Sequence, residues 1–229
     1  MSLHLEKFIH MDKTYFLITS YIGGSLAIEK TNHLIKYLKQ IKKYYPNSYI
    51  VLIDSIPNEE IAKLCDLYVC ELLNKDDNHY AQGDLDKINI GLNLLEGIGA
   101  KFVIKTAYDY WVNDIIFEQQ KQWIKLLKNG IKIIGSQWGD VKYNLTFPNS
   151  ISVGHGAYNI QAAKYLFTID TIPTEPIFEQ KVYSRLAKIF QPSDYYIYPS
   201  NFEMFNSDIY DVFNYGGKTV DYDKLNLTL

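Results

Sequence analysis

Short apolar runs alternate with longer amphipathic segments through residues 14–136, and this alternation restricts the fold more than any other feature of the chain. The apolar runs predict strands at 15–21, 48–53, 66–72, 101–106 and 131–136. The intervening segments predict helices at 25–45, 57–64, 84–98 and 113–128, with a polar loop at 74–83. Continuous apolar strands that alternate with helices are typical of a parallel sheet covered on both faces. The chain is therefore predicted to form a single three-layer α/β/α domain with a mostly parallel central sheet.

The pattern is less regular after residue 136. We predict a strand at 146–153, helices at 159–167 and 175–190, and weak strands at 195–198 and 218–220. No internal repeat and no low-complexity linker interrupts the sequence. The whole chain, residues 1–229, is therefore interpreted as one domain.

Composition excludes several classes of protein. The net charge of −3 provides no basic field for nucleic acid or an anionic membrane. No apolar run approaches the roughly 18 residues of a membrane span, and the N-terminus lacks the apolar core of a signal peptide. Cys65 and Cys70 flank or lie in a predicted buried strand, which suggests packed thiols in a reducing compartment. We therefore expect a cytoplasmic protein without a transmembrane segment.

Polar side chains gather where the predicted strands end. Thr19, Ser20 and Tyr21 close the first strand, Asp54 follows the second, and Asp109 follows the fourth. Ligands of open parallel sheets bind outside the carboxyl ends of the strands, so these residues are candidates for a binding site. The loop after the first strand has neither GxGxxG nor GxxxxGK[ST], which argues against dinucleotide and P-loop sites of the usual kind.

The segment NIGLNLLEGIGAKFVIKTAYD carries a resemblance to a known family. It has Asn89-x-Gly91 in a helix, then a stretch of small residues, a strand, and Asp109. This order is similar to that of GT-A-fold nucleotide-sugar glycosyltransferases, in particular the small family-2-like domains. The resemblance implies that Asp109 holds Mn²⁺ or Mg²⁺ against the diphosphate of the donor, because a hard cation offsets the charge of that leaving group. Ala107 stands where the family has a first aspartate.

The resemblance also implies roles for residues in the first half of the chain. Thr19, Ser20, Tyr21 and Asp54 would contact the base and ribose, Lys87 would meet the diphosphate, and Asn89 would belong to the same nucleotide-sugar site. Each also has a purely structural interpretation, as a capping residue or part of a solvated helix start. Lys105 lies in a predicted buried strand and needs a partner, for which a phosphate or Asp109 would serve.

In the second half of the chain the resemblance implies an acceptor side. Gly154-His155-Gly156 would be a turn with an exposed histidine that lines the sugar pocket, and Trp138 would be a platform for a sugar ring. Glu179, with Glu175 as the alternative, would remove the proton from the acceptor hydroxyl. A turn with an incidental histidine, a packed tryptophan and a carboxylate that merely stabilises a helix start are the competing interpretations.

The implied function is transfer of a sugar from a nucleotide-diphosphate donor to a hydroxyl of a glycan, lipid or protein acceptor. Residues 14–136 would be the nucleotide-binding half and residues 137–229 the acceptor-side half. The first alternative is a nucleotidyltransferase, for which we would expect a basic glycine-rich loop after the first strand, whereas YIGGS has no basic residue. The second is a catalytically degenerate binding module, which Ala107 favours.

Overall fold

The computed structural model describes residues 13–23, 27–71, 80–108, 114–136, 139–140, 145–146, 151, 154–168 and 178–198. The elements follow one another as β1 (Thr14–Thr19), α2 (Ala27–Tyr44), β2 (Ser48–Asp54), α3 (Glu59–Ala62), β3 (Leu67–Cys70), α4 (Tyr80–Gly97), β4 (Phe102–Ala107) and α5 (Asp114–Lys128). They continue as β5 (Ile133–Ser136), β6 (Gly139–Asp140), β7 (Leu145–Thr146), β8 (His155–Asn159), α6 (Ile160–Phe167), α7 (Phe178–Ile189), the 3₁₀ helix η1 (Pro192–Asp194) and β9 (Tyr195–Tyr198).

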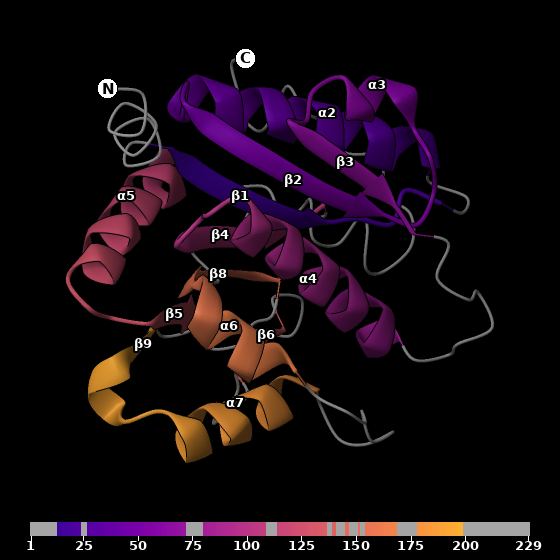
Figure 1. Ribbon diagram of the computed structural model, residues 1–229. Coiled ribbons are helices and arrows are strands. Elements are labelled where there is room, and N and C mark those ends of the chain that lie inside the picture. Colours follow the sequence, from indigo (N-terminus) through magenta and orange to yellow (C-terminus); the bar gives the residue numbers. More distant parts are fainter. Residues whose placement is uncertain are drawn as a thin grey trace.

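One sheet of seven strands organises the described residues, in the order β3-β2-β1-β4-β8-β5-β9 (Figure 1). β1 pairs in parallel with β2 and β4, β2 with β3, and β5 with β9. β8 is antiparallel to both of its neighbours, β4 and β5. Strands β6 and β7 form a separate two-stranded ribbon. The sheet is therefore mostly parallel, as predicted.

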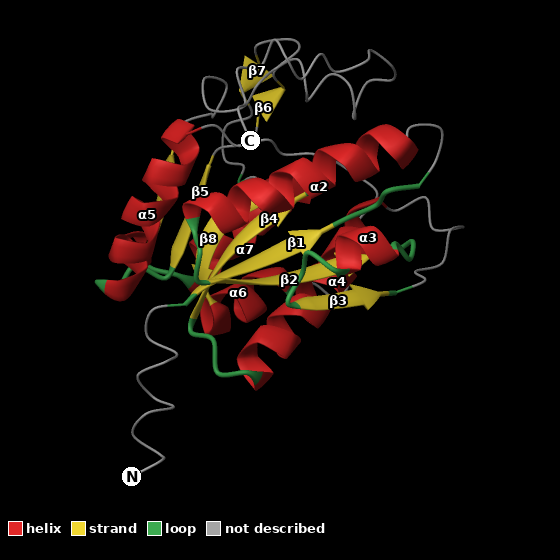
Figure 2. Ribbon diagram, turned by 90° about the horizontal axis from the view of Figure 1, so that it is seen from above, coloured by secondary structure: helices red, strands yellow, loops and turns green. Residues whose placement is uncertain are grey.

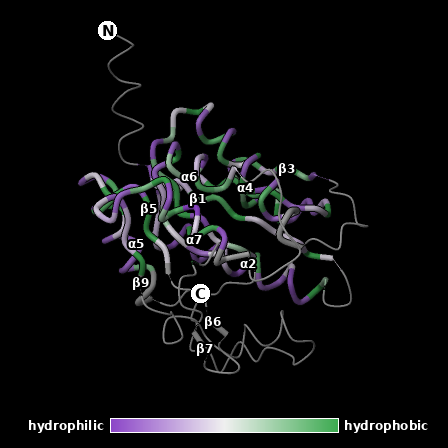
Figure 3. Tube along the Cα trace, turned by 90° about the horizontal axis from the view of Figure 1, so that it is seen from below, coloured by the Kyte–Doolittle hydropathy of each residue, from purple (hydrophilic) through white to green (hydrophobic). Residues whose placement is uncertain are grey.

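Helices cover both faces of this sheet (Figure 2). On one face α4, α6 and α7 pack in a core with Leu17 and Val103. On the other face α2, α3 and α5 pack in a second core with Phe16 and Ile104. Successive strand residues point to opposite faces, so both faces of β1 are apolar, and its trace is largely green in Figure 3. The predicted three-layer α/β/α class is confirmed.

Local sequence accounts for several element boundaries. Pro46 follows α2 closely, and a proline cannot continue the helical hydrogen bonds. The Asn58 side chain caps α3 by accepting from the N–H groups of Glu60 and Ile61. Asn159 caps α6 by accepting from the N–H group of Ala162. Asparagine is favoured at this position because its short side chain reaches the unpaired N–H groups of the first turn.

Three predictions about elements are wrong. Residues 154–156, predicted as a turn, lead into and form part of β8 in the middle of the sheet. α4 begins at Tyr80, inside the predicted loop 74–83. The predicted buried strand 66–72 is the short edge strand β3, whose residues are only half-buried, and Cys65 and Cys70 are half-buried free thiols. An edge strand has a partner on one side only, which leaves it more exposed than its sequence suggests.

The predicted strand 146–153 receives little support from the described residues. Leu145 and Thr146 form β7, while Ile151 is buried but lies in no strand. The predicted strand 218–220 lies outside the described residues. Among the helices that are described, none has the length and apolar character that a membrane crossing requires.

Candidate functional site

The carboxyl ends of β1, β2 and β4 meet at one edge of the sheet. In the sheet, Thr19 of β1 lies opposite Ile53 of β2 on one side and opposite Ala107 of β4 on the other. The Ser20 N–H group donates to the Ile53 carbonyl oxygen at 2.9 Å, and the Tyr108 N–H group donates to the Thr19 carbonyl oxygen at 3.0 Å. The structure therefore brings the predicted residues Thr19, Ser20 and Asp54 to a common edge, which we call the carboxyl edge.

Asp54 is the buried carboxylate of this edge. Its Oδ1 accepts from the N–H groups of Ser55 at 2.7 Å and Ile56 at 3.2 Å. Burial raises the pKa of Asp54, and these backbone donors together with the Ser20 hydroxyl and the Lys87 ammonium oppose the rise. The Ser20 hydroxyl lies beside the carboxyl group, yet neither it nor Oδ2 makes a hydrogen bond of regular geometry within the described residues. Buried polar atoms usually have partners, so Oδ2 is suited to receive a donor from a ligand.

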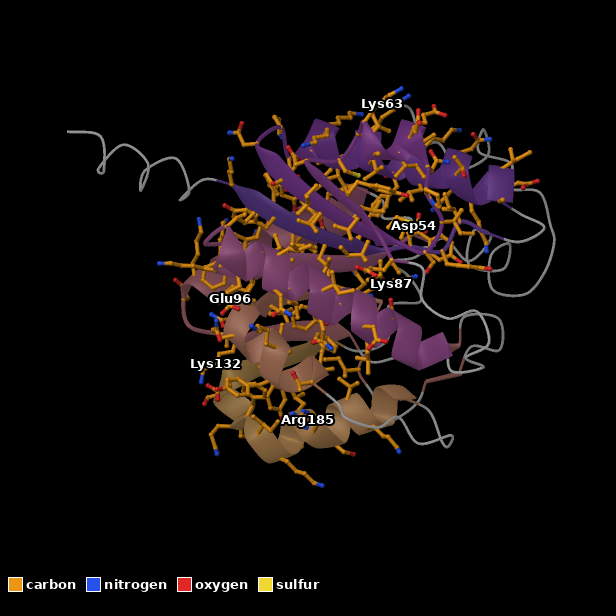
Figure 4. All side chains as sticks on the ribbon, turned by 45° about the vertical axis from the view of Figure 1, so that its right-hand side comes forward. Asp54, Lys63, Lys87, Glu96, Lys132 and Arg185 are labelled. Atoms are coloured by element: carbon orange, nitrogen blue, oxygen red, sulfur yellow. The ribbon has the colours of Figure 1, made fainter. Side chains whose placement is uncertain are left out.

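Lys87 reaches the same edge from α4. Its ammonium group donates to the Ser20 carbonyl oxygen at 2.5 Å, and only 6% of the residue is exposed. Burial lowers the pKa of Lys87, and the charges of Asp84 and Asp54 oppose that lowering. Figure 4 shows Lys87 and Asp54 near each other, at the side of the sheet away from Glu96 and Lys132. An ammonium group has three donors, so Lys87 can hold the β1 end and still bind a phosphate oxygen.

Lys105 brings a second cation to the α4 face of the sheet. The side chain leaves the middle of the sheet and is 1% exposed. Its ammonium group lies 3.4 Å from Oδ2 of Asp84, which stands one turn before Lys87 on α4. The sequence predicts that this buried lysine needs a partner, and Asp84 is that partner within the described residues. Asp84 was missed as a site residue, although its spacing of three from Lys87 places both on one helix face.

Two buried hydroxyl groups lie on the same face of the sheet. Thr19 Oγ1 and Tyr158 Oη are buried and have no hydrogen-bond partner within the described residues. Alternate residues of a strand share a face, so Thr19 lies on the same face as Leu17, which pairs with Lys105. Tyr158 pairs with Val103, two residues before Lys105, and therefore lies on that face too. The two lysine cations on this face can bind the oxygens of a phosphate ester.

Tyr21 and Gly23 form the loop that follows β1. Tyr21 is 38% exposed at the carboxyl edge. A Cβ atom on Gly23 would come within 2.3 Å of Ile56 Cδ1 and 3.0 Å of the Tyr21 ring, so a larger residue there would displace one of these side chains. Lys30, from the first turn of α2, donates to the Gly23 carbonyl oxygen at 3.2 Å. No sequence pattern indicates a role for Lys30, because only the fold brings the first turn of α2 to this loop.

The Asn89-x-Gly91 motif has packing roles in the structure. The Asn89 side-chain amide donates to the Phe167 carbonyl oxygen at 3.3 Å, which ties α4 to the end of α6. A Cβ atom on Gly91 would lie 2.1 Å from Leu17 Cδ1, so glycine lets α4 approach β1. The described hydrogen bond of Asn89 is therefore with α6, whereas the resemblance implies a place in the nucleotide-sugar site.

His155 is not exposed, which corrects the predicted Gly154-His155-Gly156 turn. The ring is fully buried against α5, where its Nε2 pairs with the Gln120 amide nitrogen at 3.0 Å and its centroid lies 5.0 Å from that of Trp123. Burial, with the Lys105 charge as a smaller cause, lowers the pKa of His155 to about 3. Gly154 and Gly156 are also buried. These residues therefore belong to the core and present no open sugar pocket.

Three predicted site residues lie outside the described residues, and the side chain of a fourth is not described. Asp109, Trp138 and Glu175 are outside the described residues, and Glu179 is placed only as backbone in the first turn of α7. Within the described part of the chain, no three histidine, cysteine or acidic side chains gather as a metal ion requires. The described residues therefore do not form a metal site by themselves, and the metal role of Asp109 stays a prediction.

Comparison with known proteins bears on the fold. No family model and no curated protein matches the chain. A solved cytidylyltransferase from Leptospira borgpetersenii matches with a TM-score of 0.52 and 14% identity, over 83% of this chain and 77% of that one. A 4-diphosphocytidyl-2C-methyl-D-erythritol synthase from Anaerococcus prevotii matches with a TM-score of 0.53 and 12% identity, over 95% of this chain and 96% of that one.

A third similar structure is a glycosyltransferase involved in the glycosylation of the major capsid of PBCV-1. It matches with a TM-score of 0.50 and 13% identity, over 81% of each chain. Neither this likeness nor the two above extends to the sequence, so they concern the arrangement of the elements. The chain therefore has the mostly parallel three-layer fold of these proteins, the GT-A, Rossmann-like class.

Proposed function

We propose that this protein is a nucleotide-dependent transferase that binds a nucleotide-diphosphate sugar at its carboxyl edge and transfers the sugar to a hydroxyl group. The observation that carries the proposal is the pair of buried cations Lys87 and Lys105, set on the face of the sheet that α4 covers. Proteins of the same fold include a glycosyltransferase and a cytidylyltransferase, which supports a nucleotide-using transferase of either kind.

The two cations are suited to a diphosphate. A buried lysine needs a negative group nearby, and here Asp84 is the partner of Lys105, while Asp84 and Asp54 both favour the charged form of Lys87. The 3.4 Å separation of Lys105 from Asp84 is longer than a good charge-assisted hydrogen bond. A diphosphate at the edge would give Lys105 a closer acceptor and Lys87 an anionic one.

The rest of the edge is suited to a nucleoside. Asp54 Oδ2 and Ser20 Oγ are a buried acceptor and a buried hydroxyl without regular partners within the described residues, and the exposed Tyr21 ring lies directly beyond them. A carboxylate accepts from ribose hydroxyls or base N–H groups, and an aromatic ring stacks on a base. In this proposal Asp109 holds the divalent ion and Glu179 removes the acceptor proton.

Nucleotidyl transfer is the second candidate, and one observation favours it. The loop after β1 lacks a basic residue in sequence, but Lys30 brings an ammonium group to it in space. A cation at that loop could meet the triphosphate of a nucleotide substrate. The two reactions differ in product, because sugar transfer releases a nucleoside diphosphate and nucleotidyl transfer releases pyrophosphate.

A thermal-shift screen tests the proposal. UDP-, GDP-, dTDP- and CDP-sugars are each added with Mn²⁺ or with EDTA, and a donor that binds the folded state raises the unfolding temperature by mass action. We expect Lys87→Met to weaken the positive donor by about 10- to 100-fold, since a charge-assisted hydrogen bond contributes about 1.5–3 kcal/mol. Lys132→Met is the matched control, because Lys132 pairs with Asp194 on the surface away from the carboxyl edge (Figure 4).

The outcomes separate the candidates. Release of a nucleoside diphosphate from the bound donor supports sugar transfer. Pyrophosphate release from CTP or another nucleoside triphosphate, without sugar transfer, supports the second candidate. Absence of a thermal shift with every donor would rule out the nucleotide-sugar proposal.

A further inference from the structure

Lys30 connects three parts of the carboxyl edge. It lies in the first turn of α2, and its ammonium group donates to the Gly23 carbonyl oxygen at 3.2 Å. The same group lies 5.1 Å from the centroid of the Tyr21 ring and 5.5 Å from that of the Tyr108 ring. Ammonium groups within roughly 6 Å of an aromatic centroid are attracted to the ring. One cation therefore links the loop after β1, the exposed Tyr21 ring, and the residue that directly follows β4.

The Tyr21 ring is confined by these contacts. A Cβ atom on Gly23 would lie 3.0 Å from both Cζ and Oη of Tyr21, so the ring rests against the glycine backbone. Ile56 Cδ1 would lie 2.3 Å from the same Cβ position, so Ile56 and the Tyr21 ring share the space beside Gly23. The ring nevertheless keeps 38% of its surface exposed. A ring that is fixed before a ligand arrives loses little freedom on stacking, and this preorganisation increases affinity.

Tyr108 connects this arrangement to the end of β4. It is buried, its N–H group donates to the Thr19 carbonyl oxygen at 3.0 Å, and the next residue in the chain is Asp109. Lys30 therefore contacts residues that follow two neighbouring strands, β1 and β4. Its contacts include a backbone carbonyl oxygen and two aromatic rings.

We propose that Lys30 is a positioning residue that holds the Tyr21 ring as a stacking platform for the base of a bound nucleotide. In this proposal Lys30 acts through Tyr21, whereas the direct phosphate contact that the nucleotidyl-transfer candidate would assign to it would weaken pyrophosphate binding as well. This inference rests on the proposed nucleotide binding. It assigns a function to a residue whose place at the edge is set by tertiary structure alone.

The test compares a base-bearing probe with a phosphate-only probe. Calorimetry measures the affinity of the full chain for UDP, CDP, GDP and ADP, and displacement of the bound diphosphate measures the affinity for inorganic pyrophosphate. We expect Lys30→Met to weaken the nucleoside diphosphate by about tenfold, through loss of two cation–π contacts and one hydrogen bond, and to leave pyrophosphate unchanged. Lys30→Arg keeps a cation that can lie over the rings, and we expect it to bind within about twofold of the wild type.

A double-mutant cycle supplies the second measurement. Tyr21→Ala removes the platform, so Lys30→Met should cause little further loss of nucleoside diphosphate affinity in that background. Lys30→Gln replaces Lys30→Met in the cycle if the methionine variant does not fold, since glutamine keeps a donor for Gly23 without the charge. Additive losses in the cycle, equal weakening of pyrophosphate, or wild-type affinity in Lys30→Met would each overturn the inference. If the wild type binds none of the four diphosphates, the proposed function itself fails.

Discussion

Acidification should destabilise the fold through His155, and the structure gives the size of the effect. The ring is buried and neutral between Gln120 and Trp123, and its pKa is lowered to about 3. In the unfolded chain the same ring titrates near its ordinary pKa of about 6.5. Between these two values only the unfolded state binds the proton, so the stability that neutral His155 provides is complete above about pH 6.5 and is lost as the pH falls toward 3.

Linkage converts this difference into a free energy. At about pH 5, protonation of this one histidine in the unfolded state lowers the free energy of unfolding by about 2 kcal/mol. At about pH 7 the same effect is close to zero. His155→Gln keeps an acceptor for the Gln120 amide but cannot titrate. The variant starts from a different stability at neutral pH, so the informative quantity is the change between the two pH values. We expect the wild type to lose about 2 kcal/mol more than His155→Gln over that interval.

Urea unfolding at each pH measures the effect, with free energies taken from the linear extrapolation and compared only where the slopes agree. Other groups titrate equally in both proteins, so the difference between wild type and variant isolates His155. Equal losses of stability in the two proteins would refute the reasoning. They would mean either that the folded state accepts the proton or that the ring is solvated in the native protein.

Two further predictions concern the motif that carries the family resemblance. Gly91→Ala should lower the free energy of unfolding by up to about 2 kcal/mol, because overpacking against Leu17 exceeds the gain in helix propensity; Gly97→Ala in the same helix meets no atom within 4 Å and should be neutral or stabilising by up to about 1 kcal/mol, as measured by urea unfolding. Asp109→Ala should abolish the difference in donor binding between Mn²⁺ and EDTA, and a variant that keeps this difference in the thermal-shift assay would remove Asp109 from the proposed metal site.

The periodicity of the sequence was sufficient to predict much of the fold. Strand β1 is apolar on both faces, and such runs occur where helices cover both sides of a sheet. Pro46 ends the predicted helix 25–45 near its observed last residue, Tyr44. These predictions succeed because each depends on side chains close together in the chain.

β8 could not be predicted in the same way. Its sequence, HGAYN, combines one glycine with two polar residues, and local patterns of this kind indicate a turn. The strand is stabilised by pairing with β4 and β5, and both of these strands are distant from it in sequence. Burial of His155 follows from the same pairing, because the strand register directs its ring toward α5.

The residues of the candidate site also fall into those that local sequence predicts and those that depend on tertiary packing. The strand-end residues Thr19, Ser20 and Asp54 were found because the ends of parallel strands are known from the sequence order alone. Asp84 and Lys30 were missed, since their roles arise from helices that pack back over the sheet. Asn89 and Gly91 were predicted to be part of a binding motif. In the structure they make packing contacts that hold α4 against α6 and β1.

The insertion of β8 between β4 and β5 has a consequence for synthesis of the chain on the ribosome. When β5 emerges, β4 still has an open edge, and the strand that will separate the two has not been made. An open edge of this kind can pair with the wrong strand, either in the same chain or in a neighbouring one. The strands made before β8 therefore cannot form the complete sheet during synthesis. The sheet is completed only when residues 155–159 have been made and pair with β4 and β5.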